Sequence, residues 1–199
     1  ILGDVSGKGI EAASMSALVK TALTAYAWEG AGPARMARSL NSMLMGFSRV
    51  ETFVTAFIAK IDLKAGRATY CSAGHPPTMV IRPSSTPLGG GETRGGEVEL
   101  LGCQSGVIGA FESMVYETGV FAFAPGDMLF MYTDGTIEAR DRSGVFFGEQ
   151  RLRDLLLSVS GEGVSGICGK VLGELDRFTE SALDDDIALV SLEFLRGRS

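Results

Sequence analysis

The order of apolar and polar residues divides the chain into two helices, a series of strands, a second pair of helices and a last strand. Apolar side chains recur at helical spacing over residues 10–28, 34–47, 148–158 and 164–180. Elsewhere the apolar period falls to two, which indicates strands. An apolar run ends at Asp4, and the predicted strands that follow cover residues 52–62, 67–72, 78–82, 98–101, 114–123, 127–132 and 187–194.

The grouping of helices and strands predicts an α+β domain, in which helices cover antiparallel sheet, rather than repeated βαβ units. Short turns at residues 64–66 and at Pro125-Gly126 join neighbouring strands. The Pro-, Ser- and Gly-rich segment 83–96 is expected to be a mobile loop. With 199 residues and 45% apolar content, the chain is expected to form one domain, residues 1–199, around one sizeable core.

Composition and charge exclude several classes of protein. The net charge of −6 argues against a nucleic-acid-binding surface, which needs a clustered basic face. No apolar run reaches the roughly 20 residues that cross a bilayer, and the first residues lack the pattern of a signal peptide. The three cysteines have neither a metal-binding nor a C-x-x-C spacing, so we expect buried thiols in a reducing cytoplasm. Because Ile1 falls inside a strand-like run, we expect a piece of a longer protein.

Three apolar strands border on aspartates. Asp4 ends the run in ILGDVSGKG, Asp134 follows the strand in LFMYTDG, and the acids 184–186 precede the strand in LDDDIALV. The first segment is not a P-loop, which needs four residues between its first Gly and its Gly-Lys pair. Taken singly, Asp4 and Asp134 also suit turns, and the acids 184–186 also suit a solvated turn.

These aspartates, taken together, predict a metal site. If the three strands lay side by side, Asp4, Asp134 and Asp185 or Asp186 would converge, and a cation would compensate the repulsion between their carboxylates. Oxygen ligands without His or Cys favour Mg²⁺ or Mn²⁺ over Zn²⁺. Two such ions about 3.5–4 Å apart can hold a phosphoryl group and activate a water for in-line attack. The pattern therefore predicts phosphate hydrolysis.

His75, the one histidine, lies in YCSAGHPP and has two interpretations. An imidazole titrates near neutrality and could protonate a leaving oxygen. The Gly-His-Pro-Pro sequence also suits a turn between strands whose ring simply makes a hydrogen bond to the backbone, and we favour that interpretation. Covalent Ser-His-Asp or Cys-His chemistry is not expected.

Four segments resemble a known family when taken in their order and spacing. GDVSGKGIEAA, YCSAGHPP, LFMYTDGTIEARD and LDDDIALVSL, with QSGVIGAF between them, are similar to the bacterial SpoIIE/RsbU-like branch of the metal-dependent PPM-type serine/threonine protein phosphatases. The resemblance covers nearly the whole chain. It implies a four-layer α/β/β/α sandwich of two mainly antiparallel sheets flanked by helices, with two Mn²⁺ or Mg²⁺ ions between the sheets.

The resemblance also implies roles for particular residues. Asp4 corresponds to the carboxylate that bridges both ions, and the Val5 carbonyl to a backbone ligand of one ion. Asp134 and Asp185 would complete the other ion's ligands, and Asp186 would be a supporting acid. Asp4, Asp134 and Asp185 are thus the expected catalytic residues.

Partners follow from the same resemblance. Such enzymes commonly dephosphorylate a phosphoserine or phosphothreonine on a STAS-domain anti-sigma-factor antagonist, which frees a sigma factor. They are often controlled by an upstream sensor or receiver domain in the same chain, and a homodimer is a further expectation.

The sequence differs from the family in three respects, of which the missing acidic motif and Ala188 leave a second hypothesis open. The family has further strands and an acidic motif that resembles GGDYYD before the segment with which this sequence starts, so the N-terminal strands are expected to be missing. Ala188 stands where the family usually has Thr, and Ser6 stands where eukaryotic relatives carry a His. The alternative is a catalytically silent domain that keeps the fold and binds a partner. A nucleotide-binding domain is rejected on loop spacing.

Overall fold

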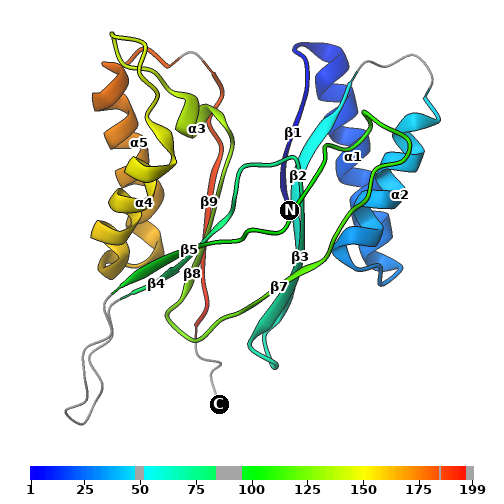
Figure 1. The fold of residues 1–199 in the computed structure, drawn as a ribbon, viewed down its shortest axis with the longest axis horizontal. Helices are drawn as coiled ribbons and strands as arrows, with labels where there is room; N and C mark the ends of the chain where they lie inside the picture. Colours follow the sequence, from blue (N-terminus) through cyan, green and yellow to red (C-terminus); the bar gives the residue numbers. More distant parts are fainter. Residues whose placement is uncertain (48–51, 84–95, 184, 196–199) are drawn as a thin grey trace. The chain divides into compact units, whose positions relative to one another are not determined.

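The computed structural model describes residues 1–47, 52–83, 96–183 and 185–195 (Figure 1). The chain divides into two compact units, one formed by residues 1–77 and 102–122 and the other by residues 78–101 and 123–199. Each unit has its own apolar cluster. The expectation of one core is therefore wrong, because each sheet buries one face against its own helices.

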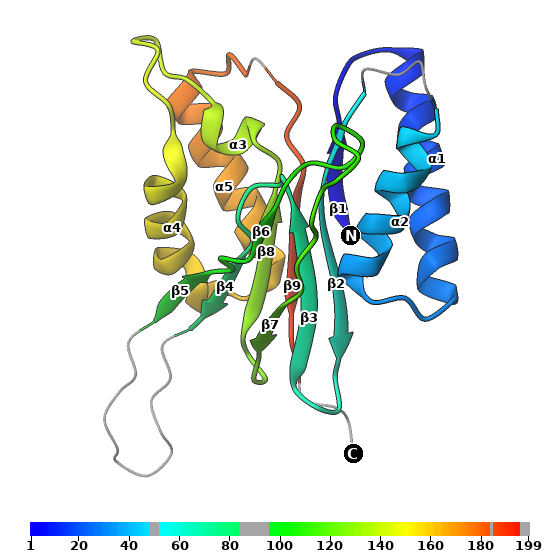
Figure 2. The same cartoon turned by 45° about the vertical axis from the view of Figure 1, so that its right-hand side comes forward.

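The first unit is a five-stranded sheet with two helices on one face (Figure 2). The sheet order is β1-β2-β3-β6, and β7 also pairs with β3; only the β3–β6 pairing is parallel among these. The elements are β1 (Leu2–Val5), α1 (Ile10–Trp28), α2 (Pro33–Met45), β2 (Val54–Asp62), β3 (Arg67–Ala73), β6 (Gln104–Ser105) and β7 (Gly119–Ala122).

Alternation along β2 separates the two faces of this sheet. Val54, Ala56 and Ile58 are buried in the cluster that contains α1 and α2. Phe57, one residue out of phase, is buried on the opposite face, where its ring stacks on Tyr70 at 5.5 Å between centroids. Thr55 shares the face of Phe57, because residues two apart on a strand point the same way.

The second unit is a four-stranded antiparallel sheet with the order β5-β4-β8-β9. Helices α4 and α5 cover one face (Figures 1 and 2), where Leu152, Leu156, Ile167, Val171 and Leu175 are buried. The elements are β4 (Met79–Arg82), β5 (Glu97–Leu100), β8 (Met128–Tyr132), α3 (Gly135–Glu138), α4 (Gly148–Val159), the 3-10 turn η1 (Ser160–Glu162), α5 (Val164–Thr179) and β9 (Leu189–Glu193).

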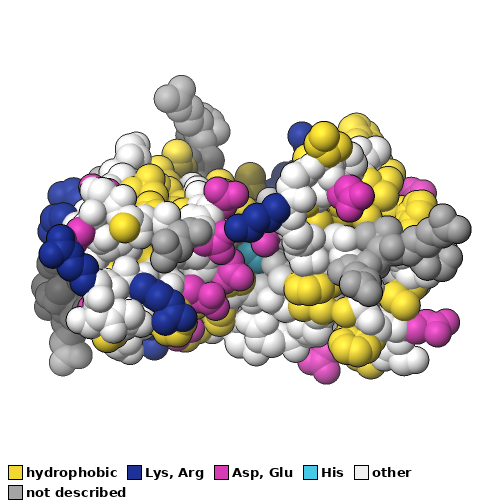
Figure 3. Space-filling view, turned by 90° about the horizontal axis from the view of Figure 1, so that it is seen from above, with side chains coloured by type: hydrophobic (Ala, Val, Ile, Leu, Met, Phe, Trp, Pro, Cys, Tyr) yellow, Lys and Arg dark blue, Asp and Glu magenta, His cyan; other side chains and the backbone are white. Residues whose placement is uncertain are grey.

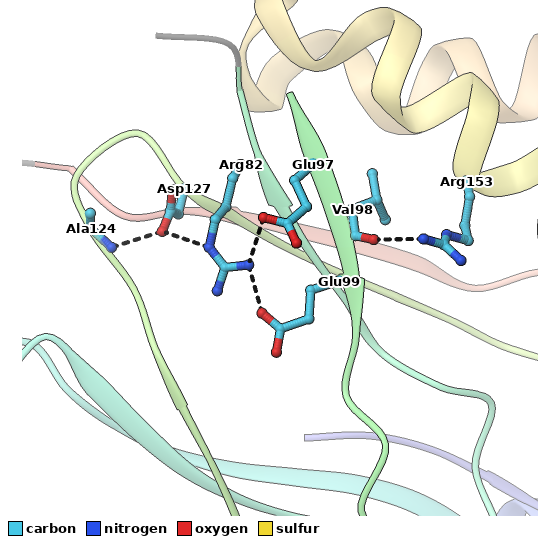
Figure 4. Close-up of polar contacts among 7 residues, drawn as sticks. All are labelled: Arg82, Glu97, Val98, Glu99, Ala124, Asp127 and Arg153. Atoms are coloured by element: carbon cyan, nitrogen blue, oxygen red, sulfur yellow. Dashed lines mark hydrogen bonds and ion pairs between the residues drawn. The ribbon is translucent and has the colours of Figure 1, made fainter. Parts of the chain in front are cut away.

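A charged cluster joins three segments of the second sheet (Figure 4). Arg82 on β4 lies 2.6 Å from Glu99 and 3.8 Å from Glu97, both on β5, and 3.9 Å from Asp127. Asp127 also accepts a hydrogen bond from the backbone N–H of Ala124 at 2.8 Å, which fixes the turn before β8. The arginine thus balances three carboxylates at the start of the strand that leads to Asp134.

The α+β class, with two mainly antiparallel sheets flanked by helices, is confirmed. Helix α1 has the predicted bounds, and the other predicted helices differ from the observed ones by at most two residues at either end. None of the described helices combines the length and apolarity needed to cross a membrane. The predicted loop 83–96 lies mostly outside the described residues.

The predicted strand 114–123 is wrong in its first half, since only β7 is a strand. Residues in that half instead pack into the loop beside α2. The Tyr116 hydroxyl lies within hydrogen-bond distance of two acceptors, Asn41 Oδ1 at 3.1 Å and the Val107 carbonyl at 3.0 Å. The Met114 side chain fills the space left by Gly106. The alternating apolar residues before β7 therefore pack a loop and do not form a strand.

Candidate metal centre

The first unit presents Asp4 at the end of an edge strand. β1 pairs only with β2 among the described strands, with Asp4 opposite Thr55. Asp4 is exposed and shares the face of Thr55, away from the helices. After Val5, the Ser6 N–H donates to the carbonyl of Phe53 at 2.9 Å, and the Phe53 N–H donates to Ser6 Oγ at 2.9 Å. These bonds fix the backbone that follows the carboxylate.

Gly3 permits the close approach of β1 to β2. A Cβ atom at this position would lie 2.6 Å from the Thr55 carbonyl oxygen, far inside van der Waals contact. The glycine therefore sets the distance between the two strands at the point where Asp4 leaves the sheet.

The second unit brings Asp134 together with Asp185 and Asp186. β8 runs antiparallel to β9, with Tyr132 opposite Leu189, so the end of β8 and the start of β9 lie at the same edge. A Cβ atom on Gly135 would lie 2.8 Å from the Asp186 carbonyl oxygen and 3.4 Å from Asp185 Cβ. The exposed Asp134 therefore lies in a backbone segment that directly contacts the segment of the exposed Asp185 and Asp186.

Hydrogen bonds hold these two segments in place. The Ala188 N–H donates to Thr133 Oγ1 at 2.9 Å, the Thr133 N–H donates to the Ala188 carbonyl at 3.1 Å, and Thr133 Oγ1 also lies 3.4 Å from the Asp186 carbonyl. Thr133, buried at 8% exposure, thus supplies a hydroxyl beside the acids, although position 188 is Ala. Asp134 also caps the one-turn helix α3, accepting from the Gly135 N–H at 3.0 Å.

We expected the strands that border Asp4, Asp134 and Asp185 to lie side by side, and this is confirmed for two of the three. β8 and β9 are neighbours, whereas β1 belongs to the other sheet, so Asp4 does not join Asp134 through strand pairing. Within the described ranges, no group of three or more His, Cys, Asp or Glu side chains lies close enough together to hold a metal ion. Asp184 lies outside those ranges. In Figure 3, acidic side chains gather on the second unit at the end that carries α3.

The available donors suit a hard divalent cation. Asp134, Asp185 and Asp186 offer carboxylates on the second unit, and Asp4 and the Val5 carbonyl offer oxygens on the first. These oxygen donors match the preference of Mg²⁺ and Mn²⁺. Because the two segments of the second unit are already fixed by Thr133, ion binding there would order few additional backbone groups.

The remaining candidate groups do not provide a nucleophile. Burial raises the pKa of the Cys71 thiol to about 11, which keeps it protonated at neutral pH. Cys103 and Cys168 are partly exposed, so the expectation of buried thiols holds for Cys71 only. His75 is buried, and its Nδ1 atom lies 3.1 Å from Thr55 Oγ1, a side-chain contact that the sequence did not reveal.

The fold is similar to that of solved PP2C-type domains. The chain resembles the SiaA-PP2C domain of Pseudomonas aeruginosa, with a TM-score of 0.79 and 20% identity over 96% of this chain and 73% of that one. It also resembles RsbX in complex with magnesium, with a TM-score of 0.64 and 21% identity over 95% of this chain and 77% of that one.

Sequence comparison identifies the family. Residues 1–195 match the family described as Stage II sporulation protein E (SpoIIE), and the chain belongs to that family. It is 25% identical to Phosphoserine phosphatase RsbU of Bacillus subtilis over 96% of this chain and 54% of the relative. It is likewise 25% identical to Protein IcfG of Synechocystis over 96% of this chain and 33% of that protein. The chain therefore spans about half or less of these curated relatives.

Substitution of Gly135 tests the contact between the two acidic segments. In Gly135→Ala, the new methyl group would lie 2.8 Å from the Asp186 carbonyl oxygen. This distance is too short, so the methyl group would push the Asp186 backbone away. We expect a loss of about 1–3 kcal/mol in the free energy of unfolding, typical of overpacking, and at least a tenfold weaker affinity for Mn²⁺. Chemical denaturation and calorimetry measure the two effects.

Gly161→Ala is the matched control, since no atom lies within 4 Å of its added Cβ. An Ala in an open helical position is neutral or slightly stabilising. Equal Mn²⁺ affinity in both variants would show that the contact at Gly135 does not shape the metal centre.

Proposed function

We propose that the chain is the catalytic domain of a divalent-metal-dependent phosphatase that hydrolyses phosphoserine or phosphothreonine in proteins. The observation that carries this proposal is the junction of β8 and β9, where Asp134 lies beside Asp185 and Asp186 on backbone fixed by Thr133. Membership of the SpoIIE family and the likeness to Phosphoserine phosphatase RsbU support it.

Each candidate residue has a role in this proposal. Asp4 and the Val5 carbonyl would be metal ligands on the first unit, and Asp134 and Asp185 would be ligands on the second, with Asp186 in support, for Mn²⁺ or Mg²⁺. When bound, the ions supply charge neutralisation at the phosphoryl group and activation of the attacking water. Thr133 would hold the Asp134 and Asp186 segments together through its hydrogen bonds to the Asp186 carbonyl and the Ala188 N–H. Because the sequence offers no Ser-His-Asp or Cys-His nucleophile, we expect direct hydrolysis without a phosphoenzyme.

We infer that the substrate is a phosphorylated STAS-domain anti-sigma-factor antagonist in the cytoplasm, and that an upstream sensor or receiver domain controls the activity. Two proteins that the chain resembles support this inference. RsbU is called a phosphoserine phosphatase, and a structure that the chain resembles, with 24% identity and a TM-score of 0.70, holds the RsbU and RsbW domains of one Mycobacterium tuberculosis protein.

Phosphate release tests the proposal. The full-length protein is incubated with a phosphoserine-bearing STAS-domain protein, with Mn²⁺ or with a chelator, and a related active phosphatase is assayed in parallel. We expect release with Mn²⁺ and none with the chelator. If only the related enzyme releases phosphate, the silent-domain hypothesis replaces the proposal. That hypothesis is motivated by Ala188, which stands where the family usually has Thr.

A further inference from the structure

The buried histidine makes a side-chain contact that the turn alone does not require. His75 is 2% exposed, and its Nδ1 atom lies 3.1 Å from Thr55 Oγ1 on the neighbouring strand β2. Burial of a polar group costs free energy unless the group forms a hydrogen bond. Two apolar side chains could pack here without that cost, whereas His75 and Thr55 must satisfy each other. A polar pair at this position therefore suggests a role beyond packing.

The chain around His75 is constrained on both sides. Gly74 has φ +64°, and a Cβ there would lie 2.4 Å from Val107 Cγ1, so only glycine fits. The Gly74 N–H donates to the Ser105 carbonyl at 2.8 Å, and Ser72 Oγ donates to the His75 carbonyl at 3.3 Å. The imidazole is thus presented to Thr55 from a fixed backbone.

Thr55 in turn lies directly opposite Asp4 in the register of β1 and β2. Residues that face each other across an antiparallel pair have Cβ atoms about 4.5–5.5 Å apart on the same face of the sheet. A threonine hydroxyl has one donor hydrogen and two acceptor positions. When it accepts from the His75 Nδ1–H, its own hydrogen is available to the neighbouring carboxylate.

We propose that His75 and Thr55 are positioning residues for Asp4: His75 orients the Thr55 hydroxyl, and this hydroxyl holds the Asp4 carboxylate in the orientation that binds metal. The inference rests on the proposed function, since it assigns Asp4 to the metal centre. All three residues belong to the first unit, so the relation does not depend on the second. Groups that orient a metal ligand typically change metal affinity by about 10–100-fold when removed.

Two pairs of variants in the full-length protein separate positioning from packing. Thr55→Val removes the hydroxyl and keeps the branched shape, whereas Thr55→Ser keeps the hydroxyl and loses a methyl group. His75→Asn retains a polar atom near the place of Nδ1, whereas His75→Gln places its polar atoms near Nε2. Calorimetry gives the Mn²⁺ affinity, thermal unfolding without metal gives Tm, and phosphate release gives kcat and KM.

We expect Thr55→Val and His75→Gln to bind Mn²⁺ about 10–100-fold more weakly, with kcat lowered and the KM for phosphoprotein little changed. Thr55→Ser and His75→Asn should recover most of the affinity even where their Tm is lower. If all four variants bind Mn²⁺ as the unmutated protein does and differ only in Tm, the pair is structural and the inference is overturned. If the unmutated protein binds no Mn²⁺, the proposed function fails together with it.

Discussion

Asp134→Asn lowers Mn²⁺-dependent phosphate release by at least about 100-fold, if Asp134 is a metal ligand as proposed. Asn keeps the shape and can still cap α3, where Asp134 accepts the Gly135 N–H, so the local backbone is retained. The substitution also removes a negative charge beside Gly135, whose backbone contacts the segment of Asp185 and Asp186. Without metal, Tm should therefore rise, because like charges repel. Phosphate release and thermal unfolding measure the two effects.

The opposite directions of these effects make the result diagnostic. A variant that is merely misfolded would lose both activity and Tm. Asp154→Asn, an exposed acid on α4, is the control and should change neither quantity. Unchanged activity in Asp134→Asn would remove Asp134 from the active site.

We expect Asp4→Asn to remove most of the stabilisation of the protein by Mn²⁺. A ligand that binds only the folded state stabilises it by mass action, by about 2.7 kcal/mol when its concentration is 100 times Kd. The unmutated full-length protein should therefore unfold at a higher temperature with Mn²⁺ than without it. Loss of this proposed metal ligand should weaken binding by at least about 100-fold and remove most of that shift. Thermal unfolding over a series of Mn²⁺ concentrations measures it.

Glu112→Gln is the matched control for this prediction, since Glu112 is an exposed acid of the same unit. It should keep the full Mn²⁺-dependent shift. An Asp4→Asn protein that is stabilised by Mn²⁺ as strongly as this control would show that Asp4 is not a ligand.

Local patterns predicted those parts of the fold that depend on neighbours in the sequence. Helix α1 was predicted from apolar spacing alone, and the hairpin of β2 and β3 from a short turn between two alternating segments. The strand-end acids could also be found, because Asp134 and Asp185 each border an apolar strand. Such signals need only short-range periodicity and turn chemistry.

What could not be predicted depends on contacts far apart in the chain. The two-residue strand β6 pairs with β3 some 30 residues earlier and has no periodicity of its own. Sequence patterns also do not tell which sheet a strand joins, so the separation of β1 from β8 and β9 was missed. The contact between His75 and Thr55 arises in the same way, because pairing of β2 with β3 brings the turn after β3 beside Thr55.

The central claim is that the protein is a divalent-metal-dependent phosphatase in which Asp4 and Asp134 are metal ligands. The most direct test is calorimetric titration of the full-length protein with Mn²⁺, with phosphate release from a phosphorylated STAS-domain protein measured on the same samples. The account predicts two bound ions per chain and turnover in the unmutated protein, with fewer ions and no turnover in Asp4→Asn and in Asp134→Asn. Turnover that persists in both variants, or an unmutated protein that binds no Mn²⁺, would contradict it.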